Sequence, residues 1–552
     1  MEEINGEIKE LTPEKDIEKR KNKLKEFFFG WVKDNYDKAF LFVLAFSCIV
    51  GLIVFFITKG QPLWYDAANF MSTAQKWALN LTNVNDIWYY RRGIFWVLYS
   101  FIFFKVGIGE IGVQFSGVLF YLGVIISSYF LLNEMFNKKI ALISSIPLSL
   151  SWVLLFYIGR SMTELPSTFF LLLSLLFFWK GYVLKKGNKF LYLFGFFYGL
   201  ACFTRMELLL FALPIFIYIF VDQKLKLFID KRLWITLAIF LLVLIPVIIL
   251  YVTHYGNIIT DILTYYFGIG AQQAGISSSA SSKTFFDLFS YFGDLPYLLT
   301  TALFVVFLIG VLFFFANLFI GIDKLFKDKD IQKKFFILLW IIVPIFVLGR
   351  ITDYVEERYL IPLFPFLFML IAIPFLKFED FLVKHFKFKK ALALGLSILI
   401  LLAMIIPGIS FGKSLIDNKK TSYLEVEQAA LWFKANSNPQ DVIISDSLPY
   451  FTYYAQRTTY PSGIGNWARH LDVTALSNYS AGEQGFNEFV SNTHPAYMML
   501  SSFEASAQWA FDYPQNHSNI LTPIKAFYQS GSQQPVIIIY KFNYPTNYTA
   551  TK

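Results

Sequence analysis

The chain has 552 residues, of which 56% are hydrophobic and only 16% are charged. Soluble globular proteins are roughly 45–50% apolar and about 25% charged, so this composition excludes an ordinary soluble enzyme. The net charge of +9 comes mainly from lysines in short loops between apolar segments. The basic character of cytoplasmic loops explains this charge better than nucleic-acid binding does.

The chain begins with a polar segment rich in Lys and Glu, residues 1–38. We interpret it as a cytoplasmic N-terminal tail, because it is too long and too acidic for the first part of a signal peptide. The apolar segment that follows is predicted to be an uncleaved signal anchor. Cys48 and Cys202 both lie in apolar segments, and their spacing indicates buried core residues rather than a disulfide or a metal site.

Apolar segments long enough to cross a bilayer as helix recur along residues 39–411. About eleven crossings are predicted, at 39–58, 112–132, 140–158, 163–183, 189–204, 207–221, 234–253, 296–317, 335–349, 359–376 and 391–411. Alternate loops are dense in lysine, which places these loops and the N-terminus in the cytoplasm and the C-terminus outside. The stretch 94–106, within the first external loop 59–111, is short for a crossing, and we predict an interfacial or re-entrant helix there.

The character of the sequence changes in residues 412–552, where amphipathic helical patterns alternate with short β-rich runs. Strands are predicted at 441–445, 497–501 and 536–542, and helices at 423–435 and 450–457. The predicted fold is therefore a polytopic α-helical membrane protein, with about 11 transmembrane helices and a C-terminal extracytoplasmic α/β domain.

On this topology the ionisable residues near the spans lie at their external ends, and almost none lies in mid-span. A secondary transporter usually binds its substrate near the midplane, whereas an enzyme acting on a lipid-linked substrate needs polar groups at one headgroup level. The pattern favours the enzyme, and a transporter or flippase of a lipid-linked sugar is the alternative. Asp66, flanked by aromatic residues such as Tyr65, is a candidate general base; an exposed loop carboxylate is the simpler reading.

Arginines at the same level are candidates for binding a phosphate. Arg91 and Arg92 precede the short apolar stretch, and Arg358 and Tyr359 precede the run 360–362. Each arginine could instead extend its side chain to the lipid headgroups.

The remaining candidates for the substrate cavity are Arg160, Glu164, Arg205, Glu207 and Glu357. Glu164 precedes a proline at a predicted helix start, so an ordinary helix-terminal role is equally compatible with it. Arg205 and Glu207 could simply pair with each other.

Four segments, in this order along the chain, resemble the C-type integral membrane glycosyltransferases, and within them the protein mannosyltransferase and aminoarabinose transferase group. These segments are Tyr65-Asp66, the Arg-Ser-Met-Thr-Glu-Leu-Pro turn at 160–166, residues 199–205, and the Glu-Arg-Tyr-Leu-Ile-Pro run at 357–362. The C-terminal domain also looks like the tail of many prokaryotic members.

The resemblance implies a sugar donor linked to dolichyl or undecaprenyl phosphate and an inverting transfer on the outer face. It implies Asp66 as catalytic base and Arg358 as a phosphate ligand; the acceptor would be a protein, a lipid or a glycan. Ala67 stands where protein mannosyltransferases commonly have Glu, which puts a protein acceptor in doubt, and the paired prolines expected near 92–96 are absent. No histidine cluster indicates a metal site, and a divalent metal cofactor stays open. A prokaryotic plasma membrane is the predicted location.

Overall fold

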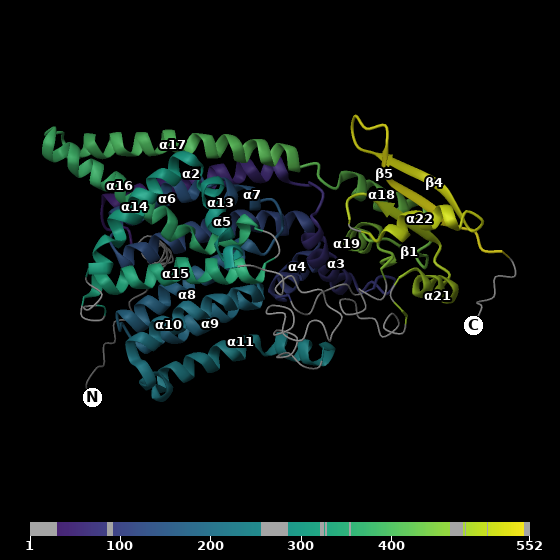
Figure 1. The fold of residues 1–552 in the computed structure, drawn as a ribbon, viewed down its shortest axis with the longest axis horizontal. Coiled ribbons are helices and arrows are strands. Elements are labelled where there is room, and N and C mark those ends of the chain that lie inside the picture. Colours follow the sequence, from purple (N-terminus) through teal and green to yellow (C-terminus); the bar gives the residue numbers. More distant parts are fainter. Residues whose placement is uncertain are drawn as a thin grey trace, which may run out of the picture.

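The computed structural model describes residues 30–85, 92–255, 285–320, 325, 328–352, 355–463, 479–480, 482–504 and 506–545. Most of the described chain is helical (Figure 1). The helices up to the start of the C-terminal domain are α2 (Asn35–Thr58), α3 (Tyr65–Leu79), α4 (Phe95–Lys105), α5 (Glu110–Met135), α6 (Lys138–Ser149), α7 (Trp152–Tyr157), α8 (Glu164–Phe178), the π-helix η1 (Trp179–Val183), α9 (Asn188–Thr204), η2 (Met206–Phe211), α10 (Ala212–Gln223), η3 (Lys224–Ile229), α11 (Lys231–Tyr255), η5 (Phe285–Phe289), α13 (Ser290–Leu299), α14 (Thr301–Ile320), α15 (Lys329–Ile351), η7 (Glu357–Leu363), α16 (Phe364–His385) and α17 (Lys390–Lys419).

Eight helical segments of the described chain are long and apolar enough to cross a membrane. Their outward surfaces are apolar as well: the side chains of Phe42 on α2 and Leu399 on α17 are 74% and 63% exposed. Such surfaces need lipid rather than water around them. The predicted polytopic helical membrane fold is thus confirmed.

Three of the predicted crossings are shorter or interrupted helices. The segment 140–158 is divided into α6 and α7, with Pro147 inside α6 and a break at 150–151. The segment 296–317 is divided between α13 and α14 at Thr300, whose φ is +66°. The segment 189–204 forms α9, which has 17 residues. Hydropathy marks apolar segments but does not show where a helix breaks within one.

The helices α3 and α4 lie at the end of the bundle that faces the C-terminal domain (Figure 1). They pack against each other, and α4 has only 11 residues. At 1.5 Å per residue α4 is about 16 Å long, too short to cross a bilayer core. The length of α4 agrees with the predicted short helix in the first loop.

The C-terminal domain contains one five-stranded sheet with the strand order β2-β1-β3-β5-β4. The first three strands run parallel, and β5 is antiparallel to both β3 and β4. The strands are β1 (Val442–Ile444), β2 (Thr458–Tyr460), β3 (Tyr497–Ser501), β4 (Leu521–Tyr528) and β5 (Pro535–Phe542); the helices are α18 (Leu424–Asn436), α19 (Leu448–Tyr450), the π-helix η8 (Phe451–Ala455), α21 (Glu483–Thr493) and α22 (Gln508–Asn516). The predicted α/β domain is confirmed, and β2 and β4 are additions to it.

Hydrogen bonds join this domain to the end of the helical module that carries α3. The amide of Leu63 donates to the hydroxyl of Tyr454 at 3.0 Å, and Tyr453 donates to Glu110 at 2.8 Å. The Asn85 side chain pairs with the backbone of Thr459 in both directions, at 2.6 and 3.1 Å. The loop that carries the candidate base is therefore packed between the membrane helices and the C-terminal domain.

Candidate active site

Asp66 lies in the first turn of α3, where the positive end of the helix dipole favours a carboxylate. The aromatic residues on both sides of it, Trp64 and Tyr65, line the same cavity as Asp66. The side chain of Asp66 is 26% exposed. The carboxylate is thus at a cavity wall and within reach of a ligand.

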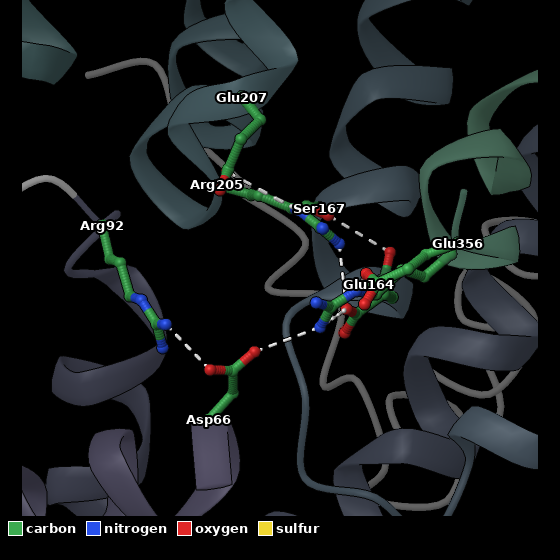
Figure 2. A network of polar contacts seen from close by, with 8 residues as sticks. Asp66, Arg92, Glu164, Ser167, Arg205, Glu207 and Glu356 are labelled. Atoms are coloured by element: carbon green, nitrogen blue, oxygen red, sulfur yellow. Dashed lines mark hydrogen bonds and ion pairs between the residues drawn. The ribbon is translucent and has the colours of Figure 1, made fainter. Parts of the chain in front are cut away.

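Arg92 approaches Asp66 from the loop before α4. Its Nη2 lies 2.8 Å from Oδ1 of Asp66, and Figure 2 shows the two groups facing each other. The next residue, Gly93, packs directly on the end of α9: a Cβ atom there would lie 2.4 Å from the carbonyl oxygen of Phe203 and 2.5 Å from that of Thr204. Only glycine allows this contact, which places Arg92 opposite Asp66.

Arg358 approaches Asp66 from the other side, from η7 immediately before α16. Its Nη1 lies 3.1 Å from Oδ2 of Asp66 and 3.5 Å from Oε1 of Glu164, and its Nε pairs with Glu356. The two oxygens of Asp66 therefore contact two different arginines (Figure 2).

Glu164 extends the network toward α9. It is the first residue of α8, its side chain is 1% exposed, and its Oε1 lies 3.0 Å from Nη1 of Arg205. Arg205 also pairs with Glu207 at 3.6 Å, and its guanidinium lies over the Tyr359 ring at 4.9 Å. Burial of this ion pair requires that its charges stay matched.

The two arginines control the acidity of Asp66. Burial alone would raise the pKa of its carboxyl, but the charges of Arg92 and Arg358 and their hydrogen bonds outweigh burial and place that pKa well below its usual range. Asp66 is consequently ionised at any physiological pH.

A cavity of about 510 Å³ opens beside this network. Aromatic side chains make up about half of its lining, and carboxylates and cations make up a third of it. The lining comprises Trp64, Tyr65, Asp66, Trp152, Phe156, Tyr157, Met162, Tyr297, Glu356, Glu357, Arg358, Leu415, Lys419, Ser422 and Tyr423. An aromatic cavity of this size with a few convergent polar groups is typical of a small-molecule site.

Arg160 lies behind the wall of this cavity rather than in the network. Its guanidinium is stacked between the rings of Trp64 and Phe156, at 4.3 and 4.5 Å, and the side chain is buried. Its Nη1 donates one long hydrogen bond, 3.4 Å, to the carbonyl of Lys419, and burial lowers the pKa of Arg160 to about 10. No carboxylate of the described chain forms an ion pair with it.

The structure thus brings together most of the residues that the sequence singled out. Asp66, Arg92, Glu164, Arg205, Glu207 and Arg358 form one network of ion pairs, and Tyr359 stacks on two of its arginines. Tyr65 and Glu357 line the cavity, Arg160 lies behind it, and Arg91 is outside the described residues.

Sequence reasoning missed the far wall of the cavity, formed by Trp152 and Tyr297 from the helical module and by Lys419 and Tyr423 where the C-terminal domain begins. No local pattern marks these residues. The described residues include no group of three or more His, Cys, Asp or Glu side chains that could hold a metal ion.

Residues 93–250 match the family model of dolichyl-phosphate-mannose-protein mannosyltransferases. This segment includes Gly93, Arg160, Glu164, Arg205 and Glu207. A search of curated proteins gives no match.

Solved structures match over nearly the whole chain. ArnT from Cupriavidus metallidurans bound to undecaprenyl phosphate is 12% identical with a TM-score of 0.58, covering 95% of this chain and 100% of ArnT. The Archaeoglobus fulgidus oligosaccharyltransferase tethered to an acceptor peptide is 14% identical with a TM-score of 0.58, covering 94% of this chain and 76% of that protein.

The chain therefore has the fold of the C-type integral membrane glycosyltransferases, as the sequence resemblance predicted. The segment carrying the Arg160–Pro166 turn matches the protein mannosyltransferase model, and the architecture as a whole is similar to that of ArnT.

Proposed function

We propose that this protein transfers a sugar from a polyprenyl-phosphate donor to a hydroxyl group of an acceptor on the outer face of the membrane. The observation that carries the proposal is the position of Asp66, whose carboxylate lies between Arg92 and Arg358 at the wall of the 510 Å³ cavity. The undecaprenyl phosphate bound to ArnT supports the donor class.

In the proposed reaction, the acceptor hydroxyl oxygen attacks the anomeric carbon of the donor sugar. The bond between that carbon and the phosphate oxygen breaks, the hydroxyl proton passes to Asp66, and polyprenyl phosphate leaves. One displacement inverts the anomeric configuration. Because phosphate is a good leaving group, the protein has to position the reactants and stabilise charge rather than form a covalent intermediate.

The arginines would have two roles in this reaction. Guanidinium groups bind phosphate oxygens in a fixed planar geometry, so Arg92 and Arg358 are suited to hold the leaving phosphate. The contacts that they now make to Asp66 also keep it a weak base. A phosphate that takes over these contacts would raise the pKa of Asp66 and make it a better base only when donor is bound.

The buried pair of Glu164 and Arg205 would support this arrangement. Glu164 contacts Arg205 and also Nη1 of Arg358, the nitrogen that contacts Asp66, so it helps to fix the position of that nitrogen. The aromatic wall offers ring faces to the sugar, and Glu357 offers a hydrogen-bond partner for its hydroxyls. The acceptor stays open among a protein, a lipid and a glycan, and the location is proposed to be the plasma membrane.

The proposal is tested by sugar release from a panel of radiolabelled dolichyl- and undecaprenyl-phosphate sugars, with a membrane extract as acceptor source. Wild type is expected to consume one donor, and Asp66→Asn to be at least about 100-fold slower, since a general base contributes that much. Asp512→Asn, the same change at an exposed position of α22, is the control and should keep full activity. A fully active Asp66→Asn would overturn the catalytic assignment, and consumption of no donor would favour the transporter.

A further inference from the structure

A second pocket, of about 480 Å³, lies at the other end of the helical module from Asp66. It is lined by Tyr182, Lys185, Asp222, Gln223, Lys224, Lys226, Ile229, Asp230 and Arg232. The segment Glu164–Val183 begins at the active site and ends at this pocket after 20 residues. Twenty helical residues span about 30 Å, the thickness of a bilayer core, so the pocket is at the headgroup level of the opposite leaflet.

The acidic groups of this pocket are already engaged. Asp222 accepts a hydrogen bond from the Tyr182 hydroxyl at 2.7 Å. Asp230 accepts from the backbone amide, Nε and Nη2 of Arg232, at 3.0, 3.0 and 2.7 Å, and from Gln223 at 3.3 Å. Arg232 therefore matches the charge of Asp230, whereas the neutral Tyr182 hydroxyl leaves the charge of Asp222 in the pocket.

The three lysines of the pocket form no ion pair within the described part of the chain. Lys185 follows η1 and Lys224 directly follows α10, and both have a positive φ, 52° and 51°. Lys226 is the third residue of η3, which begins at Lys224. Together with Arg232 the three lysines make four cations against the two carboxylates, so the lining has a net charge of +2.

An apolar edge adjoins this charge. On η3, the side chains of Leu225, Phe228 and Ile229 are 72%, 53% and 78% exposed, and Trp234 on α11 is 53% exposed. These residues lie at the adjoining ends of two consecutive segments that are apolar enough to cross a membrane. A cationic pocket next to exposed apolar side chains at headgroup depth matches the two parts of a phospholipid.

We propose that this pocket binds the phosphate of an anionic membrane phospholipid through Lys185, Lys224 and Lys226, while its acyl chains lie along Leu225, Phe228 and Ile229. The charge selects an anionic headgroup over a zwitterionic one, because a zwitterion brings its own cation into a pocket that has a surplus of them. The site is independent of the proposed transfer reaction.

The test is native mass spectrometry of the full chain, released from nanodiscs that contain phosphatidylglycerol or phosphatidylcholine. The triple variant Lys185→Gln/Lys224→Gln/Lys226→Gln is compared with Lys387→Gln/Lys389→Gln/Lys390→Gln, which removes three exposed lysines from the loop between α16 and α17. We expect the pocket variant to lose at least about tenfold in phosphatidylglycerol affinity, and the control to lose less than about twofold.

Three results would overturn the proposal. Equal losses in both triple variants would mean that general basic charge, not this pocket, attracts the lipid. Equal binding of phosphatidylcholine to the wild type would remove the charge selection, and displacement of phosphatidylglycerol by millimolar inorganic phosphate would indicate a site for a free anion. If the pocket variant does not fold, each single variant must weaken phosphatidylglycerol binding more than Lys389→Gln does.

Discussion

Asp66 and Arg358 are separated by 292 positions in the chain, yet Oδ2 of the aspartate lies 3.1 Å from Nη1 of the arginine. The contact joins α3 to the turn before α16. It fixes the candidate base relative to the membrane helices, and it makes the acidity of that base depend on a residue that can also bind phosphate. The predictions below follow from this pair and its surroundings.

The first prediction concerns the acidic limb of the pH–rate profile. Asp66 acts as a base only when ionised, and the pKa of its carboxyl is well below the ordinary 3.8. Activity is therefore expected to persist as the pH falls through 4. Arg92→Gln removes one of the two positive charges, so the pKa of Asp66 rises and the acidic limb of kcat/KM moves upward.

The pH–rate profile of sugar release measures this shift, with Lys525→Gln on the exposed strand β4 as a charge-matched control. An unchanged acidic limb in Arg92→Gln, despite a lower rate, would show that Asp66 is not the titrating base.

The second prediction concerns Gly93→Ala. The added methyl group would lie 2.4 Å from the Phe203 carbonyl oxygen, so the loop or the end of α9 must move. We expect a destabilisation of about 1–3 kcal/mol and a loss of sugar transfer as Arg92 shifts away from Asp66. Thermal unfolding in detergent and sugar release measure the two effects.

The matched control is Gly395→Ala on α17, where a Cβ atom would meet nothing within 4 Å. This substitution should leave the melting temperature equal or slightly higher, because alanine favours helix. Equal behaviour of the two alanine variants would contradict the close packing of Gly93.

The third prediction compares two buried arginines. Arg205 pairs with Glu164, whose side chain is 1% exposed, so Arg205→Met leaves a buried carboxylate poorly matched and should cost about 3 kcal/mol. Arg160 has no carboxylate partner within the described residues and one hydrogen bond of 3.4 Å. Arg160→Met replaces the stacked guanidinium by a thioether that still contacts the rings of Trp64 and Phe156, so its free energy of unfolding should lie within about 1 kcal/mol of wild type.

Melting temperatures of the two methionine variants under the same conditions decide the comparison. A larger loss in Arg160→Met than in Arg205→Met would mean that the Arg160 guanidinium stabilises the fold through its aromatic contacts.

The fourth prediction concerns Glu504, which follows β3 in the C-terminal domain. Burial, together with the charge of Asp446, raises the pKa of its carboxyl to about 8 from an ordinary value of 4.5. The folded state thus binds the proton more tightly than the unfolded state does. The protonated carboxyl of Glu504 therefore contributes fully to the free energy of unfolding below about pH 4.5, and this contribution is lost as the pH rises through 8.

Glu504→Gln should remove this loss, so its melting temperature should exceed that of wild type increasingly between pH 5 and pH 9. Glu488→Gln, at an exposed position of α21, is the control. A constant difference across this pH range would show that Glu504 does not titrate in the folded domain.

Much of this fold could be predicted from the sequence because the bilayer imposes simple rules. A membrane span must be apolar for about 20 residues, so α2, α5 and α11 are evident from composition. The breaks near Leu150 and Thr300 depend on packing against other helices, which hydropathy does not contain. The strands β1, β3 and β5 were expected from their β-branched and aromatic runs, whereas β4 contains Pro523, a residue that is uncommon inside strands.

The candidate site followed from polarity at the membrane surface. Asp66, Glu164 and Arg358 stand out because charges near apolar spans are costly and therefore informative. The pairing between them could not be predicted, since it depends on the arrangement of α3, α8 and η7. Trp152 and Tyr297 have no such signal, because aromatic residues in this chain are too frequent to mark a cavity.

The helix α17 continues without a break to Lys419, past the predicted division at residue 411, and Leu415 and Lys419 on it line the cavity together with Tyr423. The cavity is therefore lined jointly by the helical module and by the segment that leads into the C-terminal domain. If the C-terminal domain were grafted onto a relative by joining the chains at 411, the wall of the cavity would contain residues from both parents. A chimaera that keeps one parent's chain from α17 through Tyr423 preserves the wall and lets the outer domain be exchanged as a unit.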